Sequence, residues 1–136
     1  MIYAILDTNI LVSALLTKHS DASTVKVFQN TLTGKITPIY NDIIIGEYND
    51  VLKRKKFKFE HQLVDVIIGY ILKYGISVDY TPTNIILPDP KDEPIYQAYY
   101  VTQNTHNSFL VTGNLKHFPT EPQIISATEF VNFFKL

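Results

Sequence analysis

A short apolar run that ends in an acid opens the chain. The run from Ile2 to Leu6 is typical of a buried strand, and Asp7 follows it directly, before a helical pattern that begins near Asn9. In sheets of parallel strands, ligands bind at the carboxyl ends of the strands. Because a charge is costly to bury there, we expect Asp7 to be either a functional acid or the cap of the following helix.

Apolar runs and longer helical patterns alternate along the rest of the chain, which favours βαβ units and a parallel sheet. We predict strands at 2–6, 36–40, 76–80, 108–112 and 124–125, and helices at 9–16, 20–32, 41–54, 60–73, 94–103 and after 126. The expected helix caps are Ser20 with Asp21, Asn41, and the capping box formed by Ser126 and Glu129. Gly75 is expected to end the fourth helix. These elements predict an α/β protein with one domain, residues 1–136.

The composition limits the classes of function. The chain has 136 residues, of which 46% are hydrophobic, and it has no cysteine, which excludes disulfides and cysteine-based zinc sites. Its net charge of −1 provides no global field for an anionic partner, which must be held by a local patch or by metal ions. No apolar run approaches the roughly 18 residues of a membrane span, and no signal peptide is visible, so we expect a cytoplasmic protein without a membrane contact.

Two further acids fall where apolar side chains are expected. Glu47 lies three residues after Ile44, which places it on or beside the apolar stripe of its helix. Asp92 precedes Ile95 by the same step. Together with Asp7, these carboxylates cannot gather in a low-dielectric cleft without a cation. Oxygen ligands favour Mg²⁺ or Mn²⁺.

Each acid also has a simpler interpretation. Asp7 could cap the helix that follows it. Glu47 could extend its carboxylate into solvent, and Asp92 could simply favour a helix N-terminus. A shared metal site explains all three acids at once, whereas the simpler interpretations must each hold separately.

Four blocks of the sequence resemble the PIN domain family, in order and at the family spacing. They are LDTNILVSALL, EYNDVLKR, LPDPKDEPIYQAYY and FLVTGN, and the likeness extends to the terminal SATEFVNFF segment. Within the family, the chain resembles bacterial PIN proteins that are toxins of toxin–antitoxin pairs. The resemblance implies a three-layer α/β/α sandwich with a central, mostly parallel sheet. It also implies an endoribonuclease that depends on Mg²⁺ or Mn²⁺, an RNA substrate, a cognate antitoxin and a homodimer.

Carried over residue by residue, the resemblance gives Asp7, Glu47 and Asp92 as three of four family acids. Glu93 takes the third place if the alignment shifts by one residue. Asn114 stands where the family usually reads TGD, so the fourth acid is missing. The implied catalytic set is therefore Asp7, Glu47, Asp92 and Asn114, in which Asp7, Asp92 and Asn114 hold the metal.

Other polar residues have expected roles around this set. Asn9 and Thr112 match positions that usually orient the first acid, which makes them candidates for tuning the metal site without touching it. Asp89 is interpreted as a loop residue rather than a ligand. None of the four histidines has ligand spacing with another, so we expect His117 to have a surface or packing role.

A basic cluster follows the third helix. Lys53, Arg54, Lys55 and Lys56 precede Phe57, and together they could hold a phosphate backbone with an aromatic stacking surface. The alternative is a solvated helix end whose cations favour the helix dipole. The sequence leaves both interpretations open.

Two other functions compete with the nuclease. A PIN protein whose site lacks the fourth charge, at Asn114, could bind RNA or a protein partner without cleaving. A phosphoacceptor of another doubly wound fold could use Asp7 as a nucleophile. The second is disfavoured because such proteins tend to carry another acid nearby, and here the next acid is Asp21.

Overall fold

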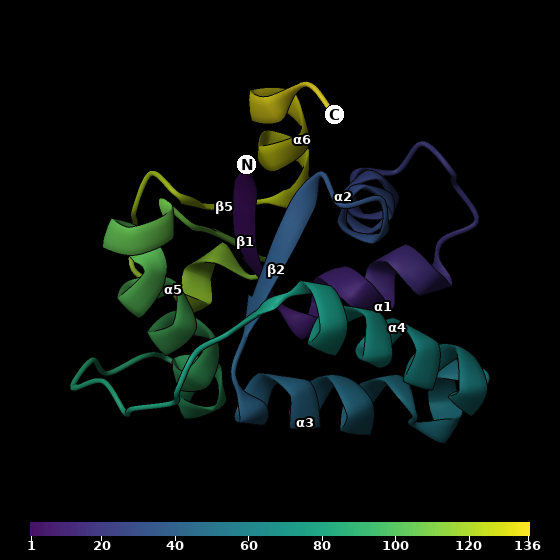
Figure 1. Ribbon diagram of the computed structural model, residues 1–136, viewed down its shortest axis with the longest axis horizontal. Helices are drawn as coiled ribbons and strands as arrows, with labels where there is room; N and C mark the ends of the chain where they lie inside the picture. The colour runs from purple at the N-terminus through teal and green to yellow at the C-terminus, as the bar shows by residue number, and fades with distance from the viewer.

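A five-stranded, entirely parallel sheet forms the centre of the computed structural model, which describes residues 1–136 (Figure 1). The strand order is β3-β2-β1-β4-β5. The strands are β1 (Ile2–Leu6), β2 (Ile36–Tyr40), β3 (Ile76–Ser77), β4 (Phe109–Val111) and β5 (Ile124–Ile125). The expected α/β class is confirmed, and the sheet has no antiparallel strand.

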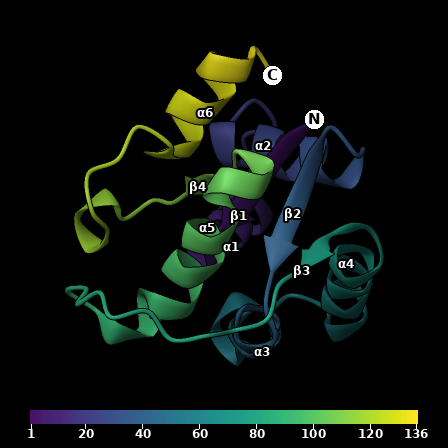
Figure 2. The same ribbon diagram turned by 60° about the vertical axis from the view of Figure 1, so that its left-hand side comes forward.

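Helices cover both faces of this sheet, as the predicted three-layer sandwich requires (Figures 1 and 2). One face is covered by α5, which contacts β1, β2 and β4, and the other by α1, α2, α4 and α6. The remaining helix, α3, runs across the carboxyl ends of the strands. The helices are α1 (Thr8–Leu16), α2 (Ser23–Leu32), α3 (Asp42–Leu52), α4 (His61–Tyr74), α5 (Glu93–His106) and α6 (Ala127–Phe134). Three short 3₁₀ helices are η1 (Lys55–Phe57), η2 (Pro90–Asp92) and η3 (Leu115–His117).

The pairing register brings the ends of β1 and β4 together. Leu6 pairs with Val111, and the Asp7 N–H extends the ladder by donating to the Val111 carbonyl at 3.0 Å. One residue beyond the end of β4, the Thr112 N–H donates to the Ile125 carbonyl at 3.0 Å. Because all strands are parallel, these carboxyl ends share one edge of the sheet. The residues just after β1 and β4 are therefore neighbours in space.

Two of the predicted helix caps are present. The Ile44 N–H donates to Asn41 Oδ1 at 2.9 Å, which satisfies one of the free donors in the first turn of α3. Ser126 and Glu129 form the expected capping box at the start of α6. These caps fix the starts of α3 and α6 directly after β2 and β5.

Other predicted boundaries were wrong. The second helix begins at Ser23 rather than Ser20, because Ser20 and Asp21 lie in a turn and the N-cap is Ala22, whose side chain cannot cap. The third helix ends at Leu52, before the basic cluster. The third strand has two residues instead of five, because the chain leaves the edge of the sheet after Ser77.

One hydrophobic core of 30 buried residues lies between the layers. Its largest fully buried side chains include Tyr48, Tyr99 and Phe130, each at most 2% exposed. The longest helices, α4 and α5, have 14 residues each. None of the helices has both the length and the apolar character that crossing a membrane requires.

Gly75 links α4 to β3 at a point where the backbone has no room for a side chain. A Cβ at this position would lie 2.5 Å from the Ile71 carbonyl oxygen and 2.7 Å from the Pro38 carbonyl oxygen. Its φ of −81° is open to any residue, so the requirement for glycine is one of space rather than of backbone conformation. Gly69, in α4, has no atom within 4 Å of a Cβ built on it.

We therefore expect opposite effects from two alanine substitutions. Gly75→Ala should lower the free energy of unfolding by about 1–3 kcal/mol, because two backbone oxygens must move. Gly69→Ala should raise it by about 0.5–1 kcal/mol, because it restores helix propensity without a clash. Denaturant unfolding of both variants beside the wild type measures the difference. Equal effects of the two substitutions would contradict the close approach at Gly75.

Candidate metal centre

Asp7 is buried at the carboxyl end of β1, with 6% of its surface exposed. Thr112 Oγ1, from the end of β4, donates a hydrogen bond of 2.7 Å to Asp7 Oδ2. Although Asp7 occupies the N-cap position of α1, its side chain makes no capping hydrogen bond. The Thr112 hydroxyl thus holds the carboxylate from the neighbouring strand end, and the Thr8 backbone makes a smaller contribution that lowers the pKa of Asp7.

Asp7 lies in a repulsive field. Burial raises the pKa of Asp7 to about 6, the Thr112 hydrogen bond opposes this shift, and the charges of Asp92 and Glu47 add to it. The structure therefore brings the three acids of the expected site within electrostatic range of one another, although they are far apart in the sequence. The charged form of Asp7 is disfavoured until a positive charge joins the cluster.

Glu47 reaches this site from α3. Its carboxylate is half-buried and accepts a hydrogen bond from the buried Thr8 hydroxyl at the start of α1. The next residue, Tyr48, is fully buried and its hydroxyl donates to the Leu6 carbonyl, which fastens α3 to the end of β1. Burial, with the charges of Asp7 and Glu47, raises the pKa of Tyr48 far above its usual range. Glu47 is therefore tied to the start of α1 and does not extend freely into solvent.

Asp92 enters from the opposite side, at the junction of η2 and α5. Its carboxylate is half-buried, and His117 Nδ1 lies 2.9 Å from Asp92 Oδ2. Burial raises the pKa of Asp92, His117 lowers it, and the charges of Asp89 and Glu47 raise it further. The charges of Asp89, just before η2, and of Glu47, in α3, therefore both act on Asp92.

Glu93, the neighbouring acid, has a different set of contacts. The Tyr80 hydroxyl donates to one of its oxygens, and the Thr83 N–H and Oγ1 each donate to the other at 3.1 Å. The carboxylate of Glu93 is thus occupied by the loop that precedes η2. Of the two adjacent acids, Asp92 is the one whose charge acts on Asp7.

Sequence reasoning missed the placement of His117 and Asp89. One potential ligand atom from each of Asp89, Asp92 and His117 lies within 4.8 Å of the other two. Spacing along the chain gave no signal for this group, because His117 meets an acid 25 residues away in the sequence. The only signal was its position in the segment directly after TGN, three residues beyond Asn114.

Asn114 and Asn9 lie beside this group at the turn after β4. Asn114 is exposed, its N–H donates to Thr112 Oγ1 at 2.9 Å, and its side chain makes no hydrogen bond to the protein. Asn9 Oδ1 accepts a hydrogen bond of 3.2 Å from the Gly113 N–H, so it holds this turn and not Asp7. Thr112 is the residue that contacts Asp7 directly.

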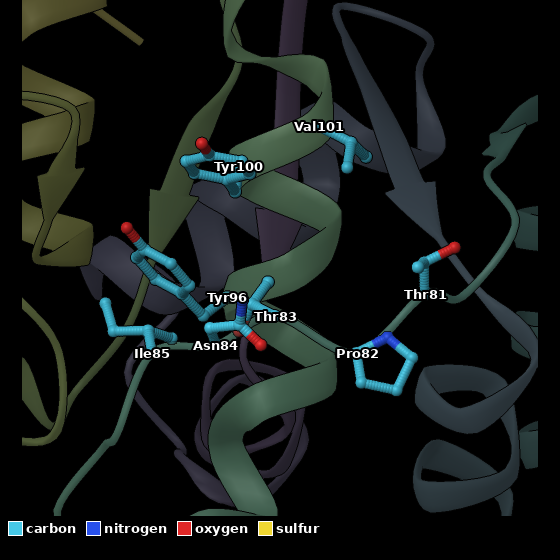
Figure 3. Close-up of a pocket in the computed structure, with 8 residues that line it drawn as sticks. All are labelled: Thr81, Pro82, Thr83, Asn84, Ile85, Tyr96, Tyr100 and Val101. Atoms are coloured by element: carbon cyan, nitrogen blue, oxygen red, sulfur yellow. The ribbon is translucent and has the colours of Figure 1, made fainter.

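Two cavities open next to the acids. One, of about 280 Å³, lies between α3 and the start of α5, with Glu47 and Lys91 in its wall. The other, of about 410 Å³, lies on the β4 side and is lined by Thr112, Asn114 and His117. A third cavity, of about 430 Å³, lies between loop 81–85 and the outer face of α5 and contains no acid (Figure 3). The third cavity therefore contains none of the residues expected at the site.

The basic cluster lies at the end of α3 that is farther from α5 (Figure 1). Two of its cations are paired with acids: Lys53 Nζ lies 2.6 Å from Asp65, and the Arg54 guanidinium lies 3.2 Å from Asp50. Lys55 and Lys56 are exposed and have no such partner. The cations that remain available to an anion are thus fewer than the sequence suggests.

The donor set fits a divalent cation. Asp7, Glu47 and Asp92 have no lysine or arginine within salt-bridge distance, and the one ion pair at the site is that of Asp92 with His117. Buried carboxylates without a counter-charge are costly, and carboxylate oxygens are the ligands that Mg²⁺ and Mn²⁺ take. The excess of negative charge at the end of the sheet therefore favours a bound cation.

The raised pKa of Asp7 predicts how the stability of Asp7→Asn compares with that of the wild type when no metal is bound. In the unfolded chain the carboxyl has a pKa near 3.8, and in the folded protein near 6. The cost of ionising Asp7 is absent below pH 4, grows between pH 4 and 6, and is complete above pH 6, where it reaches up to about 3 kcal/mol. Asp7→Asn should remove this cost, because an amide oxygen can still accept the Thr112 hydrogen bond. In the presence of a chelator, the variant should be more stable than the wild type at pH 7.5 and nearly equal to it at pH 4.

Asp21→Asn is the matched control, because Asp21 is exposed in a turn. Thermal unfolding at a series of pH values compares the three proteins. A gain in stability that does not depend on pH, or none at pH 7.5, would contradict the burial of an ionised Asp7. Addition of Mn²⁺ should reverse the order, since the metal stabilises only a protein that binds it.

Comparisons with known proteins identify the family of this chain. The family model described as "PIN domain" matches residues 3–116. Among solved structures, the fold is similar to that of VapBC2 from Rickettsia felis bound to a DNA fragment from their promoter, with a TM-score of 0.55 and 24% identity over 93% of this chain and 97% of that chain. No curated protein gave a match. On the family match and the shared fold, this chain belongs to the PIN domain family.

Proposed function

We propose that this PIN protein is a divalent-metal-dependent endoribonuclease and the toxin of a toxin–antitoxin pair. The observation that carries the proposal is the convergence of Asp7, Glu47 and Asp92 at one edge of the sheet, where burial, with the charges of Asp92 and Glu47, raises the pKa of Asp7. PIN domains are usually metal-dependent nucleases, which supports the reaction class. The fold shared with VapBC2 and the resemblance to PIN toxins support an antitoxin partner.

The proposed roles follow from the contacts of each side chain. Asp7 and Asp92 would hold Mg²⁺ or Mn²⁺, with the unbonded amide of Asn114 as a further oxygen donor, and Thr112 keeps Asp7 oriented. When bound, the metal supplies positive charge against the charge that develops on the phosphate oxygens. Glu47, which accepts a hydrogen bond from Thr8, would orient the attacking water and accept its proton.

The proposed substrate is a single RNA strand that crosses the edge of the sheet. The cavity beside Glu47 and the cavity beside Thr112 and Asn114 offer room for parts of an extended chain. Lys91, in the wall of the first cavity, and the exposed Lys55 and Lys56 provide positive charge for phosphates. We also propose a cytoplasmic location and a homodimer, both by resemblance to PIN toxins.

One observation favours a second candidate function. Asn114 brings no negative charge to the position of the fourth family acid, and it weakens the attraction for a metal, above all for a second ion. A PIN domain with such a site could bind RNA or a protein partner without cleaving it. Metal binding without RNA cleavage would support this alternative.

A cleavage assay with single substitutions tests the main proposal. Asp7→Asn and Asp92→Asn should each reduce cleavage of single-stranded RNA in Mn²⁺ by at least about a hundredfold, because each removes a charged metal donor. Asn114→Asp should increase cleavage in Mg²⁺, because it restores a negative charge. Gel analysis of labelled RNA, with circular dichroism to confirm folding, measures both effects. If folded Asp7→Asn cleaved RNA as well as the wild type does, the assignment would be refuted, because the cleavage activity would not depend on Asp7.

The unpaired lysines give a second test. The double variant Lys55→Gln/Lys56→Gln should weaken RNA binding and leave kcat nearly unchanged, because these cations lie away from the acids. Each lost phosphate contact should reduce the slope of log affinity against log salt by about 0.7 for a single strand. Lys135→Gln, at the far C-terminus, serves as the control for charge alone. An unchanged salt slope in the double variant would show that the cluster is only a solvated helix end.

A further inference from the structure

We propose that His117 is a nitrogen ligand of the divalent ion, so that Asp89, Asp92 and His117 form a mixed nitrogen–oxygen face of the site. The consequence is a preference for first-row transition ions over Mg²⁺. This inference rests on the metal site of the proposed function and does not depend on the nature of the substrate.

The donor atoms of this group lie close to one another, and one pair has the spacing of two ligands on one ion. His117 Nδ1 and Asp92 Oδ2 are 2.9 Å apart, and the ligand atoms of Asp89, Asp92 and His117 all lie within 4.8 Å of one another. Adjacent ligands on an octahedral ion with bonds of about 2.1 Å are about 3 Å apart, and opposite ligands about 4.2 Å. The spacing of His117 and Asp92 therefore matches that of adjacent ligands.

The backbone on each side holds these donors in place. On the η2 side, Asp89 Oδ1 accepts a hydrogen bond from the Lys91 N–H at 3.0 Å, and the Asp92 N–H donates to the Asp89 carbonyl at 3.1 Å. On the η3 side, the His117 N–H donates to the Asn114 carbonyl at 2.9 Å. Two short helices from distant parts of the sequence thus present their donors to the same space.

Charge and access also favour this assignment. The charge of Asp89 acts on Asp92, and no lysine or arginine pairs with either acid. The His117 side chain is 39% exposed and that of Asp92 is 16% exposed, so an ion can reach both. A neutral imidazole adds a donor atom at the site without adding charge.

The chemistry of this donor set differs from that of an all-oxygen site. Mg²⁺ is a hard ion that takes oxygen ligands, whereas imidazole suits transition ions, whose affinity for a given site rises from Mn²⁺ to Co²⁺. Asn114 brings no negative charge to the site, which makes an all-oxygen Mg²⁺ site weaker. His117, three residues later, brings an imidazole nitrogen, which transition ions accept as a ligand.

The test uses the full chain loaded with Mn²⁺ and pulsed electron paramagnetic resonance, which detects a nitrogen nucleus bound directly to the ion. We expect a nitrogen coupling in the wild type and its loss in His117→Gln. The control is His19→Gln, because His19 is exposed in a loop, and it should keep the coupling. By calorimetry, His117→Gln should lose about tenfold or more in affinity for Co²⁺ and less than about twofold for Mg²⁺.

The wild-type spectrum can overturn the inference even if His117→Gln does not fold. Bound Mn²⁺ without a nitrogen coupling would overturn the inference: His117 would then only orient Asp92, and the proposed nuclease would stand. A coupling that persists in folded His117→Gln would overturn it as well. If Mn²⁺ and Co²⁺ do not bind the wild type at all, both this inference and the metal basis of the proposed function fail.

Discussion

The burial of Asp7 among other acids at the carboxyl edge of the sheet is the main constraint on this structure. Asp7 is buried where β1 ends, and the charges that act on it are those of acids from η2 and α3, Asp92 and Glu47. A core that only had to be stable would place an apolar or neutral residue there, since an unpaired buried charge is among the costliest features of a fold. The burial of Asp7 therefore costs stability unless a positive charge joins the acids, and the proposed metal ion would supply that charge.

The elements that hold Asp7 and Glu47 orient these acids without compensating their charge, whereas Asp92 is paired with His117. Thr112 and Thr8 donate neutral hydrogen bonds to Asp7 and Glu47, which orient the carboxylates without neutralising them. Tyr48 fastens α3 to β1 through a backbone carbonyl and not through an acid. The hydroxyl donors thus fix the carboxylates in place, and no lysine or arginine forms an ion pair with Asp7, Glu47 or Asp92.

Much of this could be predicted from the sequence, because it is encoded locally. The apolar runs gave all five strands, and Asn41 and the Ser126 capping box marked the starts of two helices, since a cap depends on residues within one turn. The metal role of Asp7 with Glu47 and Asp92 remains a prediction. The His117–Asp92 contact could not be foreseen, because it joins two 3₁₀ helices whose approach is set by the packing of α5 and β4. The start of α2 was mistaken because Ser20 and Asp21 suit a turn as well as a cap.

The two outer strands of the sheet, β3 and β5, have only two residues each. Such short borders expose few free N–H and C=O groups, so a neighbouring chain finds little to extend in the manner of cross-chain strand addition. Self-association of this protein would then have to use helical surfaces. The short edge strands thus limit pairing through the borders of the sheet, whether between two copies of this chain or in a longer assembly.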